Sequence, residues 1–66
     1  MRLSPAYTAQ PALLGQTQGY RHFALLGERG QGAERAAELQ AVLEPDYRLV
    51  VPLAELRNRQ LWQPGW

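Results

Sequence analysis

Residues 34–43 read Glu-Arg-Ala-Ala-Glu-Leu-Gln-Ala-Val-Leu, and their conformation decides the fold of this 66-residue chain. Most of these residue types are strong helix formers, and Leu39 and Leu43 recur at helical spacing. As a strand, the same stretch places Ala37, Leu39 and Ala41 on one face. Local propensity therefore favours a helix, while the alternating pattern also allows a strand.

A strand is predicted on the N-terminal side of this stretch, over residues 20–26. Aromatic residues open it, and Gly19 and Gly27 bound it, which is typical of a short strand. Residues 27–32 then hold three glycines, but their spacing is not that of a dinucleotide-binding motif, and the chain has no Lys for a P-loop. We interpret residues 27–32 as a hairpin loop.

Turn and strand signals follow on the C-terminal side. Residues 44–47 read Glu-Pro-Asp-Tyr, which is typical of a tight turn. Residues 48–51 include the β-branched pair Val50 and Val51 and predict a strand. Pro52 suits the first turn of a helix, so residues 52–58 predict a short helical turn.

The two ends of the chain have no clear period. Residues 1–19 contain Pro5 and Pro11 among polar residues, and we predict an extended or partly disordered arm there. Residues 20–66 are expected to form one small β domain, which closes on the segment Leu61-Trp62-Gln63-Pro64-Gly65-Trp66. This segment holds both tryptophans of the chain.

Composition argues against several classes of protein. The net charge is only +1, whereas nucleic-acid binders usually carry a clear basic excess. The chain has no Cys, one His and one Asp, so we predict no metal site and no cofactor. Ser4 is its one serine, and no catalytic constellation is visible, so we do not expect an enzyme. No apolar run is long enough to span a membrane, and we expect a cytoplasmic protein.

Aromatic and arginine residues remain as candidates for binding a partner, because Trp, Tyr and Arg are enriched at interface hot spots. The candidates are Tyr7, Tyr20, Arg57, Arg59, Trp62 and Trp66. For Phe23 and Trp62 a place in the core is favoured over a partner contact. For Trp66, packing on the chain itself and contact with a partner are equally open.

Four segments carry a resemblance to a known family. They are Arg21-His22-Phe23, Glu38-Leu39-Gln40-Ala41-Val42-Leu43, Leu53-Ala54-Glu55-Leu56-Arg57-Asn58-Arg59 and Trp62-Gln63-Pro64-Gly65-Trp66. Together they resemble a family of small, Trp-rich proteins that occur mainly in cyanobacteria and some marine bacteria. The chain departs from the family pattern at Tyr7-Thr8 and at Leu53, where the family has tryptophans.

The resemblance implies a fold and brings no activity with it. Family members place β-branched residues in the segment that matches residues 38–43, which implies a strand over 34–43 despite the local propensity for a helix. We therefore predict a mainly β protein: a three-stranded antiparallel meander of residues 20–26, 34–43 and 48–51. The helical turn at 52–58 and the Trp-rich C-terminal tail would pack across one face.

The expected function is that of a non-catalytic accessory subunit that docks on a larger protein assembly, with Trp66 and Tyr7 as anchors. The family's distribution associates such an assembly with photosynthesis or light harvesting. The alternative is a small nucleic-acid-binding module, which would use Tyr20, Arg21, His22, Arg48 and Arg57. A homo-oligomer paired through the edge of strand 48–51 or 20–26 is a third possibility.

Overall fold

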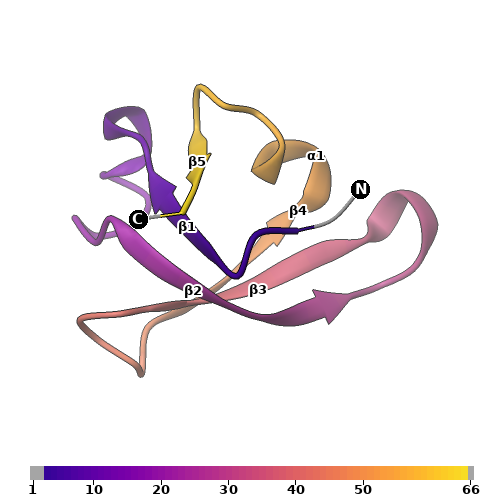
Figure 1. Ribbon diagram of the computed structural model, residues 1–66, viewed down its shortest axis with the longest axis horizontal. Coiled ribbons are helices and arrows are strands. Elements are labelled where there is room, and N and C mark those ends of the chain that lie inside the picture. The colour runs from indigo at the N-terminus through magenta and orange to yellow at the C-terminus, as the bar shows by residue number, and fades with distance from the viewer. Residues whose placement is uncertain (1–2, 66) are drawn as a thin grey trace.

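The computed structural model describes residues 3–65 and has a five-stranded antiparallel sheet in the order β4-β3-β2-β1-β5 (Figure 1). Its elements are β1 (Ala6–Ala9), η1 (Pro11–Leu13), β2 (His22–Arg29), η2 (Gly32–Glu34), β3 (Ala36–Ala41), β4 (Arg48–Pro52), α1 (Leu53–Leu56) and β5 (Trp62–Pro64). The sheet curls, so that α1 and β5 lie on the same side of β2 and β3 (Figure 1). The mainly β class with a short helix is as predicted.

Within residues 34–43 the structure has a strand, β3, and no helix forms over Ala36–Ala41. β3 pairs with β2 on one side and with β4 on the other, and Leu39 lies opposite Leu25 and Leu49. Ala37, Leu39 and Ala41 are all buried on the same face. Two neighbouring strands and a buried face therefore override the helical propensity of these residues, as tertiary context can do.

The predicted meander is confirmed as the β2–β3–β4 part of the sheet. β2 runs beyond the predicted end at residue 26 and continues to Arg29. Its register with β3 shifts between Leu25 and Gly27, which leaves Leu26 as an extra residue. Such a bulge bends a strand and increases its twist, which accounts for the curvature of β2 in Figure 1.

The prediction of only three strands is wrong, because the sheet has two more. β1 lies within the segment expected to be an extended arm, and it pairs with β2 on one side and β5 on the other. The sheet thus includes residues from both sides of the expected boundary after residue 19. β1 also means that β2 is not an edge strand, so pairing with a second copy through residues 20–26 has no free edge to use.

The C-terminal tail supplies the fifth strand rather than packing across the sheet. β5 is an edge strand paired with β1 alone, where Pro64 is tolerated since an edge residue needs no outward N–H. The Thr8 hydroxyl donates to the Gly65 carbonyl at 2.7 Å, and the Gly65 N–H donates to the Ala6 carbonyl at 2.7 Å. These bonds attach the end of the described chain to its first strand.

The core forms inside the curl of the sheet. Trp62, Phe23 and Leu39 are among its largest fully buried side chains. The rings of Phe23 and Trp62 meet edge to face, with centroids 5.5 Å apart, a favourable geometry for aromatic pairs. Leu53 and Leu56 of α1 are also buried and cover this core from the side opposite β2 and β3. The prediction that Phe23 and Trp62 belong to the core is confirmed.

The hairpin between β2 and β3 requires glycine at residue 30. Gly30 has φ of 81°, and a Cβ there would lie 2.5 Å from the Glu34 carbonyl oxygen. We expect Gly30→Ala to lower the free energy of unfolding by about 2–3 kcal/mol, because it combines a left-handed backbone with a backbone clash. Gly32 has φ of 58° but open space around it, so Gly32→Ala should lose only about 1 kcal/mol.

Urea unfolding of the two variants measures the difference. Equal losses of unfolding free energy in the Gly30 and Gly32 variants would contradict the clash at Gly30. Both losses would then come from the left-handed backbone conformation alone.

Candidate partner-binding surface

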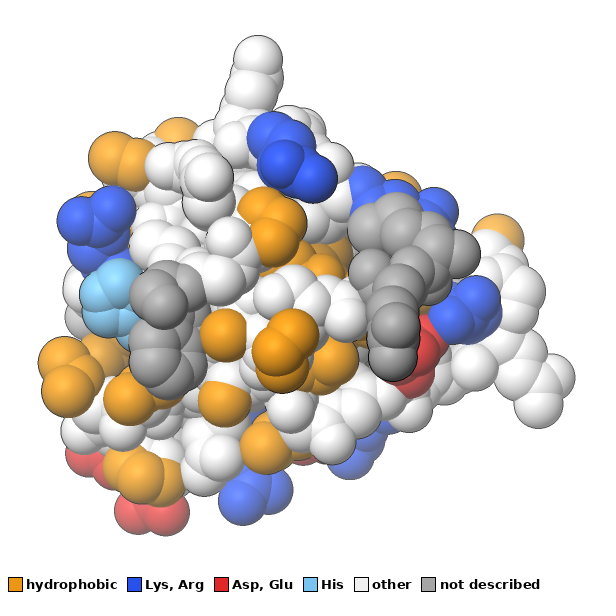
Figure 2. Space-filling model, viewed as in Figure 1, with side chains coloured by type: hydrophobic (Ala, Val, Ile, Leu, Met, Phe, Trp, Pro, Cys, Tyr) orange, Lys and Arg blue, Asp and Glu red, His pale blue; other side chains and the backbone are white. Residues whose placement is uncertain are grey.

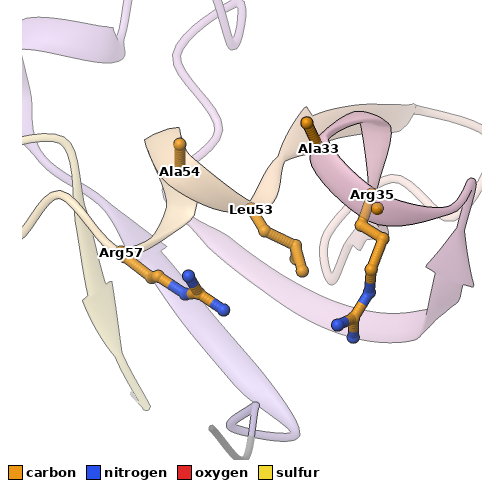
Figure 3. Close-up of a pocket in the computed structure, with 6 residues that line it drawn as sticks. Ala33, Arg35, Leu53, Ala54 and Arg57 are labelled. Atoms are coloured by element: carbon orange, nitrogen blue, oxygen red, sulfur yellow. The ribbon is translucent and has the colours of Figure 1, made fainter.

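A hollow of about 400 Å³ lies where the β2–β3 hairpin meets α1. Its lining residues define what we call the arginine hollow: Gly32, Ala33, Arg35, Leu53, Ala54 and Arg57. The first three come from η2 and the residue that follows it, and the others come from α1 and its C-cap. In Figure 3 both guanidinium groups extend to the same side, with the Leu53 side chain between them.

Backbone hydrogen bonds hold the two walls of the hollow together. The Leu53 N–H donates to the Arg35 carbonyl at 3.1 Å, which fixes the start of α1 against the end of the hairpin. The Arg57 N–H donates to the Leu53 carbonyl at 3.0 Å, which closes the helical turn. The relative positions of Arg35 and Arg57 are therefore set by backbone structure, and only their side chains need to be ordered by a ligand.

The two arginines differ in their electrostatic partners. Arg35 forms an ion pair with Glu28 through Nη2 and Oε1, and both side chains are largely exposed. Arg57 is exposed and has no ion pair with any residue that the structure describes. The lining contains no Asp or Glu. The hollow thus combines an apolar floor at Leu53 with an unpaired cation, a combination that suits a carboxylate beside an apolar group.

In the face of the molecule drawn in Figure 2, apolar side chains gather near the centre, with arginines at several points around them. Leu53 itself is 6% exposed, so the floor of the hollow belongs to the core rather than to a mobile surface. A ligand at the hollow would therefore meet an apolar base that is fixed in the core and the guanidinium groups of Arg35 and Arg57 beside it.

The structure separates the residues predicted to bind a partner. Arg57 lines the arginine hollow, whereas Arg59 is exposed outside it, and its carbonyl accepts a bond from the Gln10 side chain at 3.3 Å. Tyr20 is half-buried, and its ring centroid lies 5.3 Å from that of Tyr47.

Tyr7 and Trp62 are core residues at 2% and 1% exposure. The Tyr7 hydroxyl accepts a hydrogen bond from the Ser4 N–H at 3.0 Å, so it fixes the chain that enters β1. Neither ring is exposed in this fold, and the expected partner contacts of both stay predictions. The prediction for Trp66 falls outside the described residues.

Sequence reasoning missed Arg35 and Leu53 as parts of one surface. Residue 35 was assigned to a strand and residue 53 to a helical turn, and 18 positions separate them in the sequence. No local pattern links them, because the Leu53–Arg35 backbone bond that joins them forms only when β4 pairs with β3.

The described part of the chain offers no group of three or more His, Cys, Asp or Glu that could hold a metal ion. Within residues 3–65 no helix is long and apolar enough to cross a membrane.

Comparison with known families places the chain. Residues 12–66 match the model of a family described as "Tryptophan-rich protein (DUF2389)". The chain belongs to this family. The tryptophan-rich family model thus covers β2 to β5 and all six residues of the arginine hollow, and β1 lies before the matched region. No curated protein and no solved structure matches the chain.

Proposed function

We propose that this chain is a non-catalytic accessory subunit that docks on a larger protein assembly through the arginine hollow. The observation that carries the proposal is Arg57, which is exposed beside a fixed apolar floor and has no ion pair among residues 3–65. Arginine forms planar, charge-assisted hydrogen bonds with carboxylates, and it is a frequent hot-spot residue at interfaces. The partner surface would therefore present an acidic side chain next to an apolar one.

The small size of the fold favours a binding role over a catalytic one. A chain of this size is marginally stable alone, and a partner that binds the folded state adds stability by mass action. The resemblance to cyanobacterial proteins makes a photosynthetic or light-harvesting assembly in the cytoplasm our proposed place of action.

Reversing the charge of Arg57 tests the proposal. We expect Arg57→Glu to weaken the complex at least tenfold, because it replaces a charge-assisted hydrogen bond of about 1.5–3 kcal/mol with a repulsion. The tagged chain is purified from its own organism after nuclease treatment, the co-purifying proteins are identified, and their affinity for each variant is measured. Arg21→Glu is the matched control, since Arg21 is exposed and does not line the hollow. Equal affinities for Arg57→Glu and the unmodified chain would reject the hollow as the docking site.

The same purification tests the nucleic-acid alternative. The rings of Tyr20 and Tyr47 form a tilted pair, and each tyrosine is followed in sequence by an exposed arginine, Arg21 or Arg48. This arrangement favours base stacking with phosphate contacts. If nuclease removes the partners, or if Arg21→Glu weakens binding more than Arg57→Glu does, the alternative replaces the docking proposal.

A further inference from the structure

A second hollow lies where the two ends of the curled sheet approach each other. It measures about 170 Å³ and is lined by residues of β4, of α1, of the segment around η1 and of the start of β5. We call it the seam groove, and its lining residues are Leu13, Gln16, Thr17, Leu49, Val50, Val51, Glu55 and Trp62. This volume is below the roughly 300 Å³ at which pockets for drug-sized ligands begin, so it suits one inserted side chain.

The β4 side of the seam groove is a free strand edge. β4 pairs with β3 alone, with Val50 opposite Glu38. The Ala41 N–H donates to the Tyr47 carbonyl and the Leu53 N–H to the Arg35 carbonyl, which fixes the alternation along this pair. By that alternation Leu49 and Val51 turn their backbone groups toward β3, and Val50 turns its N–H and C=O away from it.

Val50 also exposes its side chain, at 54%. Its backbone and side chain therefore both lack the neighbour that a further strand would supply. A free edge of this kind is a template for pairing with another chain.

Trp62 supplies a second and independent observation. Trp62 is among the lining residues and is 1% exposed, and its buried indole Nε1 has no hydrogen-bond acceptor among the described residues. Buried polar groups almost always have a partner, and an unmet donor is destabilising. Because this nitrogen is itself buried, an acceptor would reach it where a ligand inserts between the lining residues.

The polar residues that line the groove restrict which chemical group can act as the acceptor. Glu55 is the one charged residue among the lining residues, so an acidic side chain would meet a like charge there. A neutral amide avoids that repulsion, because its carbonyl accepts from the indole while its NH₂ group can donate to Glu55 or Gln16.

We propose that the seam groove binds an extended peptide segment of a protein partner, which adds to the sheet beside β4 and inserts an Asn or Gln side chain toward Trp62. The peptide residue opposite Val50 exchanges both backbone hydrogen bonds with it and covers its exposed side chain. The next peptide residue points to the inner face of the sheet, because side chains alternate, and enters the groove. Strand addition of this type takes affinity from the backbone and specificity from alternate side-chain pockets.

A peptide segment fits this edge better than a second copy of the chain. In a two-fold pair of β4 strands, the inner-face residues offered by the copy would be Leu49 and Val51. These side chains are aliphatic and have no acceptor for the Trp62 indole. Such a pair would leave the donor unmet.

The test uses a cyclised hairpin peptide with one strand of sequence Thr-Gln-Val-Gln-Thr, since a preorganised strand binds with a smaller entropy loss. Its central Val pairs with Val50, and a Gln then points to the inner face in either strand direction. Two matched peptides replace both Gln by Leu or carry an N-methyl group on the central Val. Binding to the ¹⁵N-labelled full chain is followed at the Val50 amide and at the Trp62 indole, which is assigned with Trp66→Phe.

We expect both resonances to move on titration to about 1 mM peptide, a concentration that detects weak binding. The Gln peptide should bind about fivefold more tightly than the Leu peptide, as one neutral hydrogen bond predicts. Trp62→Phe should remove that preference, and N-methylation should abolish binding.

Three results would overturn the proposal. They are a Val50 amide that does not respond to the Gln peptide, equal affinities for the Gln and Leu peptides, and a Val50 shift that depends on protein concentration without peptide. The last would identify a second copy as the occupant. Arg57→Glu should bind the peptide like the unmodified chain, so this site and the arginine hollow can fail separately.

Discussion

A chain cut to residues 20–66 is expected to be unfolded in isolation. The cut removes β1, which lies between β2 and β5 and is the one strand that β5 pairs with. It also removes Tyr7, Ala9 and Leu13 from the core, all of them at most 3% exposed. The two large side chains, Tyr7 and Leu13, contribute about 2–5 kcal/mol each, a loss comparable with the roughly 3–10 kcal/mol available to a chain of this length.

The measurement is the dispersion of a ¹⁵N NMR spectrum together with a urea unfolding curve. A chain cut to residues 3–66 is the control, since it keeps β1 and Leu3, which packs against the core. It should unfold cooperatively, near the midpoint of the full chain. Cooperative unfolding of residues 20–66 would instead support the prediction from sequence, in which residues 1–19 are a dispensable arm.

The meander was predictable because its signals are local or are carried by residues with clear preferences. Tyr20 and Phe23 fall between Gly19 and Gly27, which bound the first strand, and Pro45 and Asp46 mark the turn before β4. β3 was predicted through the resemblance, since its own residues favour a helix. Burial of Ala37 and Leu39 between two strands supplies the free energy that their propensity does not.

β1 and β5 could not be recognised in the same way. β1 has four residues, two of them Ala, and β5 has three residues that end in Pro64. Such short segments carry too little pattern, and a proline argues against a strand unless its edge position is known. β5 depends on β1 and on the bonds that join Gly65 to Thr8 and Ala6, which lie 57 or more residues before it in sequence. β1 in turn pairs with β2 and β5.

The candidate sites also depend on contacts between residues that are far apart in the sequence. Arg57 was predicted from its residue type, but the arginine hollow also needs Arg35, which the β3–β4 pairing brings to α1. Tyr7 was expected to anchor a partner, whereas a place in the core was favoured for Trp62, and the fold buries both. An aromatic residue near a chain end thus indicates burial or binding equally, and only the presence of β1 decides between them.

Trp62→Ala is expected to remove most of the stability of the fold. The side chain is 1% exposed and meets the Phe23 ring edge to face at 5.5 Å. Truncating a buried aromatic residue to Ala loses about 3–5 kcal/mol, and the ring pair adds about 0.5–1.5 kcal/mol. The total is comparable with the whole free energy of unfolding expected for a chain of this length, about 3–10 kcal/mol. Near-ultraviolet circular dichroism and urea unfolding should show a largely unfolded chain at 25 °C.

Trp62→Phe separates the apolar ring from the indole N–H. Phe keeps an aromatic edge against Phe23 but buries less area, and it removes the donor that has no acceptor among the described residues. An unmet buried donor is destabilising by about 1–3 kcal/mol, so its removal offsets the lost area. We expect the free energy of unfolding of this variant to lie within about 1 kcal/mol of the unmodified chain. A loss near that of Trp62→Ala would mean that the indole N–H stabilises the fold without a ligand. The N–H would then not be an unmet donor for a ligand in the seam groove.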